Sequence, residues 1–541
     1  MSEKRKRIQL NKKQVDGLFY LSLVMLGFFV FLFIGSQEPV FFDDSGAYLR
    51  IESTEGIMPI YPLFLLINQY LFGNDSYLKI VIFEQAVLAV FCIVLFVKVI
   101  KDKFLLKYWD AYLIFGFSLM PFTTDLPLAM STQEILTEGI AYALFYLWVA
   151  LLLQAVWSKR YNWLAGAFVM TVILSLVRSQ LQILFGVCGI IFLYIMCTSG
   201  HLCKKGYMVG RIIIGVIACL AISIVGVVLI SKITVGYKNT IKNNECFFEF
   251  IAAVQAPDEY REYLKNKQDA TTQAGTIKED ISQNNQQNVT YEELVNKSFS
   301  SSQYVSLIFS RGMYEADLED EKLFDDEVLR GLFHELYIAV ESEQQRYEYA
   351  QKGLWMWKDI VGSIGKIGKT CFRIPSEYYA AYYPDVILSD DFSNFRNAHL
   401  QEIGLTLLKA HFGRFVYHTL MLLPSAFICT VFFQVAPIYG LCHLVTLFLY
   451  VSALALMIWA YADKKVQNKY AEFMAVVLGT NIVMVLIISL VFFGQQRYLV
   501  YNFGIFYMAY FLLLQQLWKH RIYDWVHREN RRDKSKEVVD E

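Results

Sequence analysis

The chain has 541 residues, of which 56% are hydrophobic and only 18% charged, against about 25% charged residues in ordinary soluble domains. This deficit excludes a water-soluble enzyme. The net charge of -1 argues against a nucleic acid partner, because binding of phosphates needs a surplus of lysine and arginine.

Apolar runs long enough to cross a membrane fill the first part of the chain. A helix that spans about 30 Å of hydrocarbon needs roughly 20 apolar residues, with charges at its ends. Suitable runs are Leu18–Ser36, Leu78–Ile100, Ala111–Phe122, Ile140–Trp157, Trp163–Val177, Leu181–Cys197 and Arg211–Ile230. We predict a membrane module over residues 18–230, preceded by a basic cytoplasmic segment, residues 1–17.

Basic residues set the orientation, because loops rich in lysine and arginine stay in the cytoplasm. They cluster at Lys4–Arg7, Lys98–Lys107, Lys159–Arg160 and Lys204–Lys205, which share one side if the runs alternate. Residues 37–77, 123–138 and 178–180 are therefore expected to face outward.

A hydrophilic stretch, residues 231–411, then predicts a large extracytoplasmic domain, because it contains no run long enough to cross. Further apolar runs, Phe412–Phe433, Tyr439–Tyr461, Phe473–Phe493 and Tyr498–Trp518, form a C-terminal membrane part over residues 412–518. The tail, residues 519–541, is basic at its start and is expected in the cytoplasm.

The number of crossings conflicts with these charges. Four crossings after an outward domain would leave the tail and Lys464–Lys465 outside. We therefore predict that Phe412–Phe433, which Pro424 interrupts, is interfacial or re-entrant. This leaves ten or eleven helices, with the parity open.

The first outer loop contains two adjacent carboxylates, Asp43 and Asp44, beside the membrane surface. Carboxylates are expensive there unless they have a function. One would act as a base, and the other would bind a metal or support the first. The alternative is that one of them caps the helix that runs through Tyr48.

The outer loops contain two further features. Met58–Pro62 belongs to an apolar segment with two prolines that is too short to span and is predicted to lie along the interface. The second outer loop carries Asp125, Glu134 and Glu138, of which the last two share a helix face at i, i+4. The alternative for these acids is an exposed interfacial face.

Two arginines are expected at outward helix junctions. Arg178 is followed by Gln180, and Arg497 by Tyr498. An arginine at such a place can bind a phosphate, or it can extend to the lipid headgroups. Together the two favour an anionic lipid ligand.

Three histidines, His399, His411 and His418, approach the same outer face. The spacing of the last two would align them on one side of a helix. They could hold a metal ion, or they could be ordinary polar residues.

Taken in order, several of these groups resemble the GT-C glycosyltransferases, which use polyprenyl-phosphate sugars. The groups are Asp43–Asp44 with Tyr48, Met58–Pro62, Leu136–Glu138, Arg178 and Arg497–Tyr498. The resemblance covers mainly Leu18–Cys197 and the overall layout. It implies an all-α, GT-C-like bundle of about ten or eleven transmembrane helices with a large outer domain.

The resemblance also implies a reaction, an inverting transfer of a sugar from a polyprenyl-phosphate donor to a glycan, lipid or protein acceptor. Asp43 or Asp44 would be the general base, and Arg178 and Arg497 would bind the donor phosphate. The sugar and acceptor would contact Tyr48, Tyr61, Asp125, Glu134, Glu138, Gln180 and Tyr498. Asp125 and Glu138 would alternatively hold a divalent metal ion.

These features predict an integral protein of the bacterial cytoplasmic membrane with its active site outside. Two other classes stay open. In a polysaccharide polymerase or ligase, the charged residues of the outer domain would carry the activity. A lipid-linked sugar transporter or flippase would place polar residues near mid-membrane, whereas the charges here gather at the outer helix ends.

Overall fold

The computed structural model describes residues 11–34, 38–42, 45–49, 58–125, 129–198, 208–243, 303–342, 392–432, 439–463, 466–491 and 496–519, with isolated residues between 367 and 383. These residues form helices and no β-strand, apart from one isolated bridge. Nine of the described helices are long and apolar enough to cross a membrane. The chain is therefore an all-α polytopic membrane protein, as predicted.

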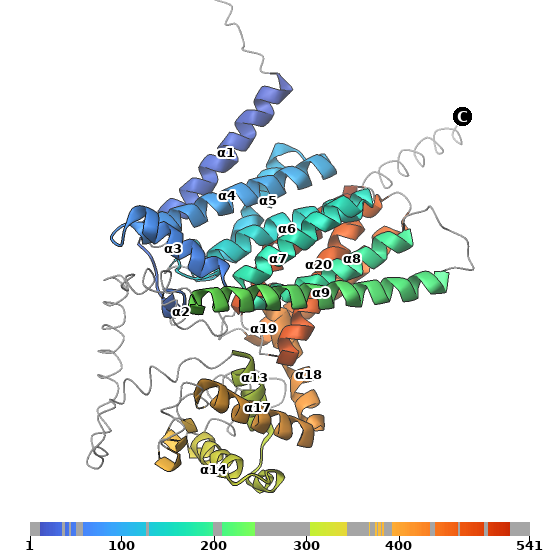
Figure 1. Ribbon diagram of the computed structural model, residues 1–541. Coiled ribbons are helices and arrows are strands. Elements are labelled where there is room, and N and C mark those ends of the chain that lie inside the picture. Colours follow the sequence, from blue (N-terminus) through green and yellow to red (C-terminus); the bar gives the residue numbers. More distant parts are fainter. Residues whose placement is uncertain are drawn as a thin grey trace, which may run out of the picture.

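The N-terminal part forms a bundle around α6 (Figure 1). Its helices are α1 Lys12–Phe33, α2 Ser45–Leu49, α3 Ile60–Phe72, α4 Tyr77–Phe104, α5 Tyr108–Leu119, α6 Glu138–Ser158, α7 Tyr161–Val177, α8 Leu184–Thr198 and α9 Met208–Asn243, with the 3-10 helices η1 Met120–Thr123 and η2 Ser179–Ile183. Of the apolar 18-residue segment in α6 that could cross a membrane, 78% is buried, against 17% in α9. A helix that is apolar on all sides can be surrounded by other helices, as α6 is, or can face lipid, as α9 does.

Two glycines allow the helices around α6 to approach closely. A Cβ atom at Gly139 would lie 2.6 Å from the Gln85 side-chain oxygen, and one at Gly504 would lie 1.9 Å from the carbonyl oxygen of Phe117. Small residues at such contacts let backbones meet within a membrane. The first contact brings α4 against the start of α6, and the second brings α5 against the last helix.

Polar contacts at one end of the bundle define its basic face. They are the ion pairs Asp16–Lys101 (2.9 Å) and Lys159–Glu472 (3.3 Å), and the hydrogen bonds from Lys469 to the Lys103 carbonyl (2.8 Å) and from Gln515 to Asp110 (3.3 Å). They join the start of α1 to the end of α4, and the end of α6 to the start of α20. Of the four predicted basic clusters, Lys98–Lys107 and Lys159–Arg160 therefore share one face, whereas Lys4–Arg7 and Lys204–Lys205 lie outside the described residues.

The opposite end of the bundle is called the site face below. There the chain after α1 pairs with the loop before α6, since the Val40 amide donates to the Gln133 carbonyl (3.0 Å) and the Ile135 amide to the Val40 carbonyl (2.9 Å). The Gln133 side chain in turn donates to the carbonyls of Phe31 (3.1 Å) and Ile34 (2.8 Å). The two outer loops of the sequence are thus joined.

The C-terminal helices complete the bundle. They are α18 Phe412–Cys429, α19 Tyr439–Ala462, α20 Asn468–Val491, α21 Gln496–Leu499, η8 Val500–Asn502 and the helix that continues to residue 519. Asn481, near the middle of α20, donates to Tyr450 (2.9 Å), and Asn502 donates to Asn481 (2.8 Å). These buried amides join α19, α20 and η8.

Helix α18 ends at the middle of the bundle. Thr430, just after it, is hydrogen-bonded to Tyr450 (2.7 Å), and Tyr507 donates to the Val431 carbonyl (2.6 Å). Tyr450 lies about 16 Å along its helix from the start of α19 at Tyr439. Tyr507 lies about 16 Å along the last helical segment from its start at Gln496. This geometry favours the predicted re-entrant helix, although the length and composition of α18 would also permit a crossing.

A separate hydrophilic domain lies below the bundle in Figure 1 and leads into α18. It contains α13 Gln303–Glu315, η5 Leu318–Leu323, α14 Glu327–Ser342 and α17 Phe392–Ala410. Its own core includes Phe309, Phe333 and Ile403. The domain was predicted to begin at residue 231, but that position lies inside α9, which continues to Asn243.

A labelling experiment tests the re-entrant α18. If α18 does not cross, Ala462→Cys at the end of α19 shares a side with Lys107→Cys, opposite Lys79→Cys and Glu327→Cys. A membrane-impermeant maleimide, applied to sealed cells and to inverted vesicles, should therefore label the two pairs from opposite sides, above the wild-type background. Labelling of Ala462→Cys from the same side as Glu327→Cys would contradict this topology.

Candidate functional site

The centre of the site face is a buried ion pair. Glu138, the first residue of α6, is 3% exposed, and its Oε1 lies 2.5 Å from Nη1 of Arg178, which follows α7. The Thr137 hydroxyl donates to the other carboxylate oxygen (3.1 Å). The positive end of the α6 dipole also favours a carboxylate here. Both residues were predicted for the site, but their pairing was not.

Arg497 joins Arg178 at one aromatic ring. The guanidinium carbon of Arg178 lies 4.9 Å from the centre of the Tyr498 ring, and that of Arg497 lies 5.1 Å from it. The Arg497 guanidinium also donates to the Tyr498 hydroxyl (3.2 Å), while Tyr142 donates to the Arg497 carbonyl (3.3 Å). The two arginines predicted to bind phosphate are thus gathered around one tyrosine ring.

Gln180 lies in the same group. The Tyr501 hydroxyl is in contact with both Arg178 and Gln180. Tyr501 was not predicted, because it lies inside an apolar run and looks like an interfacial aromatic in the sequence. It adds a second phenol beside the arginines.

Glu134 is a buried carboxyl group whose surroundings favour its neutral, protonated form. It is 1% exposed, and its burial, together with the nearby charges of Asp125 and Glu138, raises its pKa to about 10. The protonated group can donate a hydrogen bond, which an ionised carboxylate cannot. Asp125 itself is exposed. The alternative that all three acids form an exposed face is therefore wrong for Glu134 and Glu138.

The first outer loop reaches this group through two tyrosines. The ring of Tyr48 in α2 meets that of Tyr61 in α3 edge to face at 5.2 Å. Tyr61 interacts electrostatically with Glu134 and Glu138. The two predicted sugar-contacting tyrosines of the first outer loop are therefore near the acids.

Asp43 and Asp44 lie outside the described residues. The residues that flank them, Phe42 and Ser45, are joined by two hydrogen bonds of 2.9 Å, from the Phe42 amide to the Ser45 hydroxyl and from the Ser45 amide to the Phe42 carbonyl. Ser45 is fully buried. The two ends of this short segment are thus held together at the site face.

Several buried polar atoms near the acids have no hydrogen-bond partner. They are the Tyr61 hydroxyl, the Gln85 side-chain oxygen and the hydroxyls of Ser131 and Thr132. The Gln85 amide donates to the Thr132 and Glu134 carbonyls at 3.0 and 3.2 Å. Each unpaired buried group costs about 1–3 kcal/mol, so this cluster suits a polar ligand. The isolated glutamine in an apolar run was the only sequence signal for Gln85.

The described acids do not fit a divalent metal. Glu138 is paired with Arg178, and Glu134 is neutral, so neither offers a free anionic ligand. Within the described ranges, one group of three possible ligands occurs, Asp317, Asp320 and His411 in the hydrophilic domain.

The three histidines that could have held a metal contact different partners. His411 pairs with Asp320 (2.7 Å), His418 with Glu315 (2.7 Å) and His399 with the Tyr379 hydroxyl (2.6 Å). The two carboxylates belong to the α13–η5 segment, so these contacts fix the start of α18 to the hydrophilic domain. His399 and His418 therefore fit the interpretation as ordinary polar residues, whereas His411 belongs to the group of possible ligands with Asp317 and Asp320.

Comparison with protein-family models, with curated proteins and with solved structures finds no match to this chain.

Removing one partner of the buried ion pair should destabilise the protein. Arg178→Gln leaves the Glu138 carboxylate buried and unpaired, which typically costs about 3–5 kcal/mol. The double variant Glu138→Gln/Arg178→Gln should lose less than the two single variants combined. Lys79→Gln, which breaks an exposed pair with Glu38, is the matched control and should change little. Thermal unfolding in detergent would measure this, and additive losses would contradict the pairing.

Glu134→Gln should stabilise the protein increasingly as the pH rises. A buried acid with a raised pKa stabilises the fold fully only below its unfolded value of 4.5, and the loss grows until about pH 10. The stability gap between variant and wild type should widen by up to about 1.4 kcal/mol per pH unit. Unfolding at pH 5, 7 and 9, with exposed Glu319→Gln as control, would measure it. A constant gap would show that Glu134 is ionised.

Proposed function

We propose that this protein is a membrane glycosyltransferase that moves a sugar from a polyprenyl-phosphate donor to a glycan, lipid or protein acceptor at the outer face. The observation that carries the proposal is the grouping of Arg178 and Arg497 around Tyr498, beside Glu138 and neutral Glu134. The group lies where α6 begins and α7 ends, at one end of the bundle. A phosphate carried by a lipid would meet the protein at this end of the bundle.

The charges of the buried group suit an anionic ligand. Two guanidinium groups, those of Arg178 and Arg497, lie here against one buried carboxylate, Glu138, because burial and the neighbouring charges favour the protonated form of Glu134. Arginine binds phosphate oxygens in a planar, two-pronged geometry. The neighbouring phenols and the protonated Glu134 offer hydrogen bonds that suit sugar hydroxyls.

In the proposed reaction, the acceptor hydroxyl attacks the anomeric carbon of the donor sugar. Asp43 or Asp44 takes the hydroxyl proton as the new C–O bond forms. The bond from the anomeric carbon to the phosphate oxygen breaks, and the phosphate keeps its electron pair. Attack from the opposite face inverts the anomeric configuration. Arg178 and Arg497 stabilise the charge that grows on the leaving phosphate.

Two alternatives have less support. In a polymerase or ligase, charges of the hydrophilic domain would act, yet Glu315, Asp317 and Asp320 are already paired with side chains of α18 or of the residue just before it. In a transporter, mid-membrane polar groups would form a path. The buried Asn481 and Asn502 are instead hydrogen-bonded to each other.

The proposed place of action is the outer face of a bacterial cytoplasmic membrane. Nucleotide sugars do not occur there, so a lipid-carried donor supplies the sugar. The basic face of the bundle would then lie in the cytoplasm, in agreement with the rule that positive loops stay inside.

Transfer of radiolabelled sugar from polyprenyl-phosphate donors to membrane acceptors tests the proposal. Asp43→Asn or Asp44→Asn should reduce transfer at least 100-fold, the usual scale for a lost general base, while donor binding survives. Arg497→Gln should weaken donor binding. Glu319→Gln, at an exposed carboxylate of the hydrophilic domain, should behave as wild type. Full activity in both aspartate variants would contradict the proposed base, and absence of transfer from every polyprenyl-phosphate donor would contradict the proposed function.

A further inference from the structure

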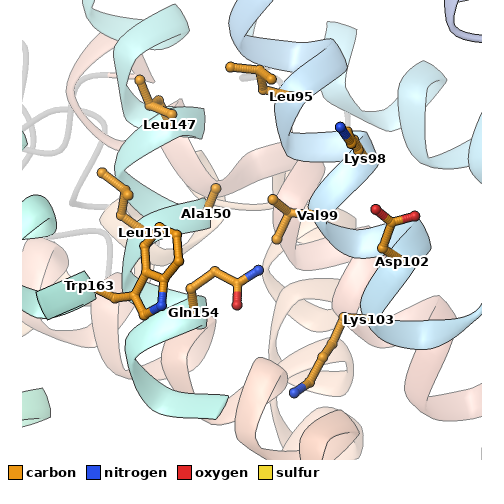
Figure 2. A pocket seen from close by; sticks show the side chains of 10 residues that line it. All are labelled: Leu95, Lys98, Val99, Asp102, Lys103, Leu147, Ala150, Leu151, Gln154 and Trp163. Atoms are coloured by element: carbon orange, nitrogen blue, oxygen red, sulfur yellow. The ribbon is translucent and has the colours of Figure 1, made fainter. Parts of the chain in front are cut away.

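A cavity opens on the basic face, far from the site described above. Its volume is about 500 Å³, and it lies between α4 and α6. Its lining is apolar at Leu95, Val99, Leu147, Ala150 and Leu151, and polar at Lys98, Asp102, Lys103, Gln154 and Trp163. Figure 2 shows the α4 side chains on one side, facing those of α6 and Trp163.

We propose that this cavity binds one phospholipid with an anionic headgroup in the leaflet at the basic face. The inference does not depend on the proposed glycosyl transfer, because it concerns the opposite end of the bundle. The depth of the cavity, its charge and its polar rim favour this lipid as the occupant.

The depth of the cavity matches one leaflet. Along α6 the lining begins at Leu147 and reaches Gln154, and the helix ends at Ser158. At 1.5 Å per residue, Leu147 lies about 16 Å from that end. Half of a hydrocarbon core of about 30 Å is about 15 Å. An acyl chain that lies along Leu147 and Leu151 would therefore extend from the headgroup region to mid-membrane.

The charge of the cavity favours an anionic headgroup. Two lysines and one aspartate line it, so its net charge is about +1. Lys98 is exposed and Lys103 is half-buried, with its ammonium group 5.2 Å from the Trp157 ring. Basic pockets between transmembrane helices on the cytoplasmic side commonly hold such headgroups.

The polar rim suits a headgroup with hydroxyls. Asp102 and Gln154 can accept hydrogen bonds from the glycerol of a phosphatidylglycerol, while the lysines meet its phosphate. Trp163 is 41% exposed at the start of α7. An aromatic ring of this kind is typical of the membrane interface, where it lies at headgroup level.

Quenching of Trp163 fluorescence by brominated lipids tests this proposal. The purified protein in detergent is titrated with phosphatidylglycerol or phosphatidylcholine that carries bromine on its acyl chains. Because the chain has nine tryptophans, the same titration of Trp163→Phe is subtracted. Half-maximal quenching of Trp163 should need several-fold less phosphatidylglycerol than phosphatidylcholine.

Variants that each remove one lysine test whether the preference for phosphatidylglycerol comes from the cavity. Lys98→Gln and Lys103→Gln should each raise the half-maximal concentration of phosphatidylglycerol by about fivefold and leave phosphatidylcholine unchanged. Lys107→Gln, at an exposed lysine of the same face outside the cavity, should behave as wild type. Unchanged melting temperatures without lipid would show that the variants fold.

Equal quenching by the two lipids would overturn the proposal, and so would an effect of Lys107→Gln as large as that of Lys98→Gln. The first result would mean that the cavity accepts any lipid. The second would mean that the whole face attracts anionic lipids without a site. Either outcome leaves the proposed transfer reaction untouched, because that reaction is assayed with residues of the site face.

Discussion

The ion pair between Glu138 and Arg178 is the interaction on which the site face depends. Removing two charges from water is expensive, and their attraction compensates only when the geometry is good and other groups assist. Here the start of α6 and the Thr137 hydroxyl assist the carboxylate, while the Tyr498 ring lies against the guanidinium. Because these partners come from the start of α6, the end of α7 and α21, the ion pair fixes three helix ends relative to one another.

The arrangement of the C-terminal helices depends on a second constraint, because backbone polar groups inside a membrane need hydrogen-bond partners. A helix can end at mid-membrane only where protein surrounds its last carbonyls. The carbonyl of Val431 accepts from Tyr507, and Thr430 is bonded to Tyr450, which Asn481 also contacts. The amides of Asn481 in α20 and Asn502 in η8 thus belong to the hydrogen-bonded group that surrounds the end of α18.

The helices could be predicted from the sequence, because a long apolar run in a membrane has few other stable forms. The end of α9 could not be located in this way. Ser231 and Lys232 follow Ile230 and look like the start of a loop, yet α9 continues to Asn243, and a long lysine side chain can reach polar surroundings from within a helix. The proximity of Arg178 and Arg497 could not be predicted from local sequence patterns either, because only tertiary packing brings the end of α7 to α21.

The ion pair with Glu138 also distinguishes the two explanations that the sequence allows for Arg178. A single arginine at a helix end most simply extends its side chain to the lipid headgroups, and in the sequence this explanation was as good as phosphate binding. However, the side chain of Arg178 is only 11% exposed and meets Glu138 and Tyr498 rather than the lipid surface. A buried arginine held between a carboxylate and an aromatic ring is already oriented, so a phosphate that reaches it need not order the side chain again. Preorganised charge of this kind stabilises a leaving phosphate most effectively.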